Sequence, residues 1–439
     1  MKRRLKKSVK TGLVIFIVVI IILISMLLLF SKSNKNKDKS NNIRNIDLVS
    51  KISNKLKDED IDKPFIKWVD TNYKGSLKKL DKLLDSKEYD KSMWHEVTNN
   101  SYIVLNDLYN KAYDNMDNVK IVDSKDTSTI SFVGDVSLAD NWFIMPYYDS
   151  RGGINGVLGS KMLDIMKSSD IMIANSEFTV SNRGTALPNK MYTFRAKKER
   201  LSIYDEMGVD MVTLANNHVY DYGLDAFNDM LDAFNEYKIP HIGAGHNIEE
   251  AKRPYYFIIN GYKIAFVSAS RAEKNIMTPG ASNDSGGVFR CYDPTDMINL
   301  IKELRGSCDY VIPIIHFGRE NSHELEEEQV SSAHAYIDAG ADMVVGHHAH
   351  TLQGVEIYND KPIIYNLGNF LFNNEAIDTA LFKVNLNKDG SMEYYIVPAL
   401  QKDSKTEVLE GDDKLRVIND INSWSINASL DEFGQIRKE

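Results

Sequence analysis

The feature that most constrains the fold is a regular alternation of two sequence patterns, which begins at Thr129. Short apolar runs rich in β-branched residues alternate with segments such as 224–237 and 324–339, where apolar residues recur every three to four positions. The runs cover residues 129–135, 171–177, 211–218, 263–270, 310–318, 342–348 and 362–370. Such alternation predicts an α/β domain with a largely parallel core sheet. We place this domain at residues 128–400 and a C-terminal tail at 401–439.

Most of these predicted strands end in polar residues. The polar ends contain Asp135, Asn175, Glu177, Asn216, Asn217, His218, His316, His347, His348 and His350. In open α/β sheets the ligand site lies outside the carboxyl ends of the strands, so we expect these side chains to converge. Carboxylate oxygens mixed with imidazole nitrogens suit Mn, Fe or Zn ions. Each residue alone has a structural alternative, such as a turn, a helix cap or a satisfied histidine. Together they favour a centre for one or two divalent transition metal ions.

The order of these motifs resembles a known superfamily. Gly134-Asp135, Asn175-x-Glu177, Asn216-Asn217-His218, His316 and His348-x-His350 resemble the calcineurin-like metallophosphoesterases. Within that superfamily, LANNHVYDYG (214–223), HIGAG (241–245), HFGRE (316–320), DAGADMVVGHHAHTLQGVE (338–356) and PIIYNLGNFLF (362–372) resemble the bacterial capsule synthesis family called CapA, which is linked to poly-γ-glutamate capsule. The resemblance covers roughly residues 129–375 and implies a layered α/β/β/α sandwich.

The resemblance also implies roles for individual residues. One metal ion would be held by Glu177, Asn217, His316 and His348, and the other by Asp135, Glu177 and His350. His218 would be the acid or the charge stabiliser for the leaving group, oriented by Asp221. Two cations at about 3.5–4 Å can activate water and neutralise a phosphoryl group, and a general acid assists the departing alkoxide.

Two positions depart from the superfamily pattern. The first motif there is Asp-x-His, but here Ser137 stands where the histidine would be. The second motif has Glu177 where aspartate is usual. The ion at Asp135 therefore has three protein ligands, so the number of ions stays open between one and two.

Four further residues are candidates for substrate binding. Arg195 and Arg319 could hold an anionic group by paired hydrogen bonds, with a structural salt bridge as the alternative. Asn216 and Asn369 could line the site, with a turn as the alternative.

The N-terminus predicts a membrane anchor. Residues 12–30 carry no charge and are long enough to cross a bilayer about 30 Å thick. The basic tail at 1–11 predicts a cytoplasmic N-terminus and an extracellular main domain. A cleaved signal peptide is the alternative, although its apolar region is normally shorter. Residues 31–45 are expected to form a linker and 46–127 a small helical stalk.

Charge is distributed unevenly along the chain. The net charge is −9, but residues 1–39 contain ten Lys or Arg and one Asp, which leaves −18 on the rest. Binding nucleic acid needs a basic footprint, so nucleic acid is excluded as an expected partner. Cys291 and Cys308 could pair in an oxidising compartment, but two cysteines form no disulfide framework.

These patterns favour one function and leave a second open. We expect a single-pass cell-membrane protein with a metallophosphoesterase-like extracellular domain, which serves synthesis or export of capsule (poly-γ-glutamate) or another envelope polymer at the cell surface. Its metal centre would activate water for a hydrolase reaction. The alternative is a non-catalytic component that binds the polymer or a partner in the capsule machinery.

Overall fold

The computed structural model describes residues 118–439 apart from 123–124, 260–261, 274–276 and 307. The chain divides into two units, Met1–Ile121 with Gly261–Lys263, and Val122–Asn260 with Ile264–Glu439. The predicted anchor, the linker and residues 46–117 of the stalk lie outside the described residues, and within the described end of that stalk lies strand β1 (Val119–Ile121). No helix in the described part of the chain is long and apolar enough to cross a membrane.

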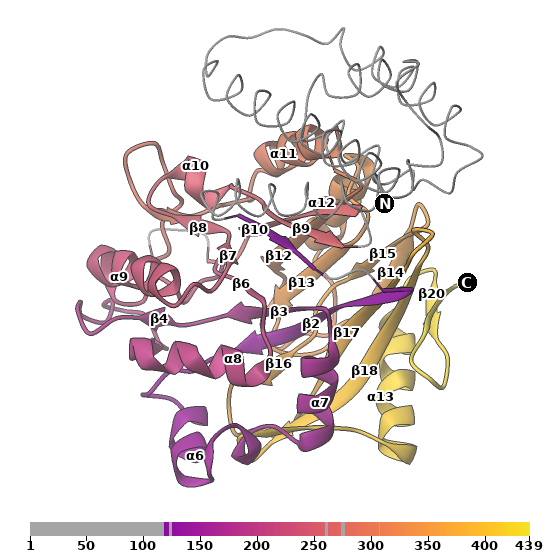
Figure 1. Ribbon diagram of the computed structural model, residues 1–439, viewed down its shortest axis with the longest axis horizontal. Coiled ribbons are helices and arrows are strands. Elements are labelled where there is room, and N and C mark those ends of the chain that lie inside the picture. The colour runs from indigo at the N-terminus through magenta and orange to yellow at the C-terminus, as the bar shows by residue number, and fades with distance from the viewer. Residues whose placement is uncertain (1–117, 123–124, 260–261, 274–276, 307) are drawn as a thin grey trace, which may run out of the picture. The chain divides into compact units, whose positions relative to one another are not determined.

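The second unit is built on two sheets (Figure 1). The first sheet has the strand order β19-β18-β17-β2-β3-β6-β7, and β16 also pairs with β2. Its strands are β2 (Thr127–Val136), β3 (Ile171–Ser176), β6 (Met211–Thr213), β7 (His241–Ile242), β16 (Asn369–Leu371), β17 (Ile377–Asn387), β18 (Met392–Lys402) and β19 (Lys405–Val408). The predicted parallel arrangement is present from β2 to β7. The remaining strands β17, β18 and β19 extend this sheet in antiparallel fashion.

Within this unit, the second sheet has the strand order β9-β10-β12-β13-β15-β14. Its strands are β9 (Tyr255–Ile259), β10 (Tyr262–Ser270), β12 (Tyr310–Phe317), β13 (Val344–His348), β14 (Val355–Tyr358) and β15 (Lys361–Ile364). Strands β10, β12, β13 and β15 are parallel, whereas β14 is an antiparallel edge strand. The parallel strands are almost entirely buried, as expected of strands covered on both faces.

Helices cover the outer face of each sheet, which gives an α/β/β/α sandwich. Apolar residues of α7 (Ser160–Ser168), α8 (Ile203–Met207) and α9 (Gly223–Glu236) pack in one core with the first sheet. Apolar residues of α11 (Thr295–Arg305) and α12 (Glu327–Asp338) pack in another core with the second sheet. Between the sheets, the rings of Phe132 and Phe266 lie 6.3 Å apart. The shorter elements are α6 (Ile144–Ser150), α10 (Ile248–Ala251), β4 (Thr179–Val180), β5 (Arg195–Ala196), β8 (Ala244–Gly245), β11 (Gly287–Val288) and the 3-10 helices Gly153–Gly156 and Lys198–Ser202.

The segment expected as a C-terminal tail is folded within the same unit. Strand β18 runs through the expected boundary, and β19 pairs with it. Helix α13 (Gly411–Trp424) buries Val417, Ile418 and Ile421, because these residues lie three to four positions apart on one helical face. A hairpin of β20 (Ala428–Leu430) and β21 (Ile436–Lys438) completes the segment.

Candidate metal centre

The predicted site residues come from adjacent strand ends of both sheets. Asp135 is the second-last residue of β2, Glu177 follows β3, and Asn217 follows β6 in the first sheet. His316 lies near the end of β12, and His348 ends β13, in the second sheet. The structure thus brings together side chains that are far apart in sequence. All of them, including His350 beyond β13, have side chains that are at most 12% exposed.

Backbone geometry explains the glycine before Asp135. A Cβ atom at Gly134 would lie 1.9 Å from the carbonyl oxygen of Gly368, so no larger residue fits there. The N–H of Asp135 donates to that same oxygen at 3.0 Å. Strand β16 therefore lies against β2, and Asn369 is in register with Asp135.

The two carboxylates share a buried amide. The side-chain nitrogen of Asn175 donates to Asp135 Oδ1 at 2.8 Å and to Glu177 Oε2 at 2.9 Å. The side-chain oxygen of Asn175 in turn accepts hydrogen bonds from Thr213 and Asn216, each at 3.1 Å. This network is fully buried and fixes the orientation of both carboxylates.

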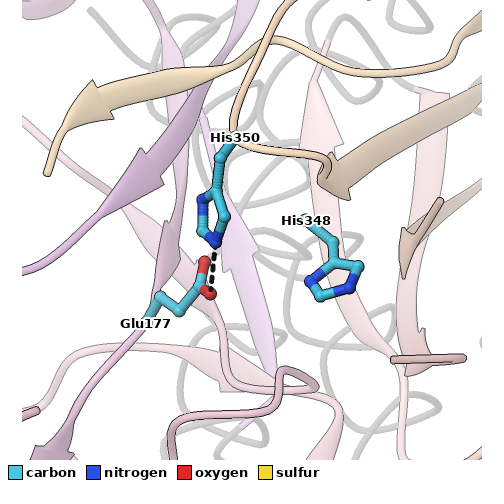
Figure 2. A group of neighbouring side chains, drawn as sticks. All are labelled: Glu177, His348 and His350. Atoms are coloured by element: carbon cyan, nitrogen blue, oxygen red, sulfur yellow. Dashed lines mark ion pairs between the residues drawn. The ribbon is translucent and has the colours of Figure 1, made fainter. Parts of the chain in front are cut away.

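Three imidazoles face these carboxylates. Glu177 Oε1 lies 3.7 Å from His316 Nε2 and 3.8 Å from His350 Nε2, and Figure 2 shows His350 directed at Glu177 with His348 beside it. His350 Nδ1 lies 3.3 Å from Asp135 Oδ2, and it donates to Asn369 Oδ1 at 2.8 Å. The rings of His316 and His348 have centroids 4.7 Å apart.

His348 and His350 also have an unusual backbone. Their φ angles are 97° and 57°, in the left-handed region that non-glycine residues seldom adopt. Such conformations cost about 1–3 kcal/mol each and persist where the surrounding structure enforces them, which is common at functional sites. This strained turn places the imidazoles of His348 and His350, at the end of one strand, near the same carboxylates.

Burial and mutual charge shift the titration of the cluster. Burial, followed by the charge of Asp135, raises the pKa of Glu177 well above its usual range. Burial, followed by the charge of His350, lowers the pKa of His348 to about 3. Burial opposes ionisation of Asp135, but the hydrogen bond with His350 and the charges of the neighbouring histidines together lower the pKa of Asp135. The same hydrogen bond raises the pKa of His350 against the effect of burial.

These side chains fit a divalent cation. Ligand atoms within 4.8 Å of one another form two groups, one of Glu177, His348 and His350, and one of Asp135, Glu177 and His316. Glu177 Oε1 and His348 Nδ1 are buried and have no hydrogen-bond partner among the described residues, which is costly unless a bound ligand satisfies them. Carboxylate oxygens and neutral imidazoles are the donors that Mn, Fe and Zn accept. Asn217 joins the cluster through its Oδ1, which lies 2.8 Å from His316 Nε2.

His218 and Asp221 form a buried pair beside the cluster. His218 Nδ1 lies 2.8 Å from Asp221 Oδ2, and the N–H of Phe194 donates to the same oxygen at 2.7 Å. The ring of Phe194 packs against His218 at 4.3 Å between centroids. This geometry leaves Nε2 as the imidazole nitrogen of His218 that is available for proton transfer.

The predicted substrate-binding residues have different surroundings. Asn216 is buried in the network described above, where it donates to Asn175 Oδ1 and Ser176 O. Asn369 contacts His350. Arg195 lies with its guanidinium 4.1 Å from the Tyr222 ring centre and lines a surface cavity of about 320 Å³.

Arg319 lies on the surface. Its guanidinium is paired with Glu324 at 3.4 Å, and its side chain is 61% exposed. Its observed contacts are thus those of the structural alternative, a surface ion pair.

Other polar strand-end residues have structural contacts. His347 Nε2 donates to Val133 O at 3.0 Å, so it links the two sheets. Ser137, at the position of the superfamily histidine, is buried with its hydroxyl unpartnered. Cys291 and Cys308 are both buried and are not joined in a disulfide bond.

Sequence reasoning assigned no role to three residues that build the site. Asn175 was recognised only as a polar strand end, although a buried Asn between two carboxylates is a clear sign of a shared donor. Phe194 and Lys190 lie in a mostly polar segment without periodicity, and no sequence pattern places them against Asp221.

Comparison with known proteins places these residues in a family context. The family model described as bacterial capsule synthesis protein PGA_cap matches residues 129–374. The PGA biosynthesis protein CapA of Bacillus subtilis is 29% identical over 280 residues, which cover 63% of this chain and 72% of that protein. The capsule biosynthesis protein CapA of Bacillus anthracis is 31% identical over 280 residues, which cover 60% of this chain and 66% of that protein. A Mycobacterium tuberculosis protein named "Probable polyglutamine synthesis accessory protein" is 27% identical over 218 residues, which cover 48% and 57% of the two chains.

Proposed function

Because the chain belongs to the bacterial capsule synthesis protein family PGA_cap, we propose that it is a metallophosphoesterase-like, metal-dependent hydrolase that serves the assembly of a poly-γ-glutamate capsule or a related envelope polymer. The family membership and the names of the Bacillus relatives support the capsule role. The hydrolase activity is supported by the arrangement of the strand-end residues.

One observation carries the proposal. Glu177 belongs to both candidate ligand groups, and its buried Oε1 has no hydrogen-bond partner in the part of the chain that the structure describes. A buried carboxylate in this situation is expected to neutralise or to bind a cation. Asp135, His316, His348 and His350 complete the ligand set, with Asn217 beside His316. A divalent ion bound there supplies Lewis-acid polarisation and lowers the pKa of water.

Side chains of the protein supply the proton transfer and hold the candidate ligands in place. Asp221 holds the Nδ1 side of His218, so the opposite nitrogen can carry the proton that a leaving oxygen needs. Phe194 packs on the imidazole and restricts its rotation. The amide of Asn175 keeps Asp135 and Glu177 oriented. This arrangement suits hydrolysis of a phosphoester or a related polar bond.

We extend the proposal to the location of the protein. The apolar segment 12–30 would anchor the chain in the cell membrane, with residues 1–11 in the cytoplasm and the sandwich outside. An extracellular sandwich would lie on the side of the membrane where a capsule polymer is displayed. The anchor is tested by membrane fractionation of the full chain and of a variant that lacks residues 12–30.

The test of the hydrolase function begins with metal content. The full chain, purified in detergent, is analysed for transition metals beside a His348→Ala/His350→Ala double variant, and both are assayed on chromogenic phosphomonoesters and phosphodiesters. We expect up to two equivalents of metal and measurable turnover, both lost in the double variant. Metal content at the background of the double variant would overturn the site.

Ser137 favours a second candidate function. This residue offers a short hydroxyl where the superfamily has an imidazole, so the ligand set near Asp135 is smaller. The second candidate is a non-catalytic component that binds the polymer or a partner in the capsule machinery. One equivalent of metal without turnover on any phosphoester would support it over the hydrolase.

A further inference from the structure

Lys190 is a buried lysine in an otherwise exposed segment. It lies between β4 and β5, next to Met191 and Tyr192, which are 85% and 53% exposed. Its own side chain is 4% exposed. A buried ammonium group is costly unless it is paired and hydrogen-bonded, so the contacts of Lys190 define its role.

Those contacts converge on the loop that carries Asn217 and His218. Lys190 Nζ forms an ion pair with Asp221 Oδ1 at 2.9 Å and another with Glu273 Oε1 at 3.1 Å. It also donates to the backbone carbonyl of Asn217. Thr278 Oγ1 donates to that same carbonyl at 2.9 Å.

The ion pair with Asp221 completes the fixation of that carboxylate. Asp221 Oδ2 accepts from Phe194 N–H and faces His218 Nδ1, while Oδ1 faces Lys190. Oδ2 is held by hydrogen bonds and Oδ1 by the ion pair with Lys190, so these contacts favour one orientation of the carboxylate and of the imidazole bound to it. The carbonyl contact holds Asn217, whose side chain lies beside His316. One ammonium group thus supports two consecutive residues of the site.

We propose that Lys190 is a positioning residue that fixes the orientation and the tautomer of His218 through Asp221. The catalytic meaning of this inference rests on the proposed function of His218. The positioning of His218 does not depend on that function, because it can be measured in the absence of any substrate. A purely structural lysine would stabilise the segment between β4 and β5 without changing the state of the imidazole.

The experiment compares Lys190→Met with Lys190→Arg in the full chain. Lys190→Met fills a similar volume without charge, and Lys190→Arg keeps the charge. Lys198→Met is the matched control, because Lys198 forms an ion pair with Glu236 at 2.8 Å but is 45% exposed. Selective ¹⁵N labelling of histidine, with a His218→Gln variant to assign the signal, reports which nitrogen of His218 carries the proton.

We expect one Nδ1–H tautomer of His218 in the parent chain and a mixture in Lys190→Met, because Asp221 loses its fixed orientation. Where turnover is present, kcat should fall about 10–100-fold, as for other residues that orient a reactive group, with KM unchanged. Lys190→Arg should restore the single tautomer, and Lys198→Met should retain it.

Lys190→Leu provides a second variant if Lys190→Met does not fold, since leucine also removes both the charge and the hydrogen-bond donor. A single Nδ1–H tautomer in a folded Lys190→Met or Lys190→Leu protein overturns the positioning role, whatever the turnover. Absence of turnover in the parent chain contradicts the hydrolase function instead, and the tautomer of His218 still decides the role of Lys190.

Discussion

The two sheets bring different kinds of candidate ligand to the candidate metal centre. Strands of the first sheet supply oxygen donors, namely Asp135, Glu177 and Asn217, and strands of the second supply the imidazoles of His316 and His348. His350 follows the same strand as His348. A cation held by both groups would link the two sheets, so metal binding and sandwich stability should be coupled.

The two sides are also held in place by different means. The carboxylates are fixed by hydrogen bonds from the buried amide of Asn175. On the imidazole side, no described residue hydrogen-bonds to His348 Nδ1, and His348 and His350 are placed by a strained backbone. Substitutions that remove a supporting hydrogen bond should therefore lower metal affinity more when the bond orients a carboxylate than when it orients an imidazole.

The largest effect is expected from Glu177→Gln, because Glu177 is shared by both ligand groups. Gln keeps the shape of the side chain but removes the charge that attracts a cation. We expect metal content to fall to background, as measured by elemental analysis of the purified full chain. Glu375→Gln is the control, since Glu375 is exposed. Retention of metal in Glu177→Gln would show that the two groups do not depend on a common carboxylate.

Asn175→Ala should have the next largest effect. The substitution removes the donor shared by Asp135 and Glu177 and leaves their oxygens unsatisfied in a buried site. Metal affinity should fall about 10–100-fold, and the free energy of unfolding should fall by about 1–3 kcal/mol. Competition with a chelator and thermal unfolding measure the two quantities. The exposed Asn182→Ala is the control, and equal behaviour of both variants would contradict a supporting role for Asn175.

A smaller effect is expected from pH. Burial and the charge of Asp135 raise the pKa of Glu177, whereas a metal ligand must be ionised. Below this raised pKa, metal binding should therefore release a proton, and metal affinity should rise with pH. Calorimetric titration in two buffers of different ionisation enthalpy measures the release. If no proton is released, Glu177 is already ionised before the metal binds.

The sequence grouped the candidate ligands better than it predicted the residues that support them. Asp135, Glu177, His316 and His348 directly end apolar strands, so the rule that ligand sites lie at the carboxyl ends of strands was sufficient to group them. The antiparallel strands β17 and β18 were not foreseen.

The supporting contacts depend on segments that meet only in the folded chain. The contact of Lys190 with Asp221 joins two loops, and the link between Asn369 and His350 joins different strand ends. Arg319 shows the opposite case, because its position after a histidine motif suggested substrate binding, while its observed partner is the surface residue Glu324.

Asn369→Ala should have the smallest effect on metal affinity. It tests whether hydrogen bonds support the imidazoles as they support the carboxylates. Asn369 accepts the hydrogen bond from His350 Nδ1, but the same nitrogen also lies 3.3 Å from Asp135. Loss of the amide therefore leaves a second acceptor, and the turn at His348 and His350 still places the ring. We expect metal affinity to fall by about tenfold or less, at the lower end for outer partners of a ligand. Chelator competition with Asn369→Ala and Asn175→Ala side by side measures the difference in metal affinity. If Asn369→Ala lost as much affinity as Asn175→Ala or more, then hydrogen bonds, and not backbone geometry, would also determine the placement of the imidazoles.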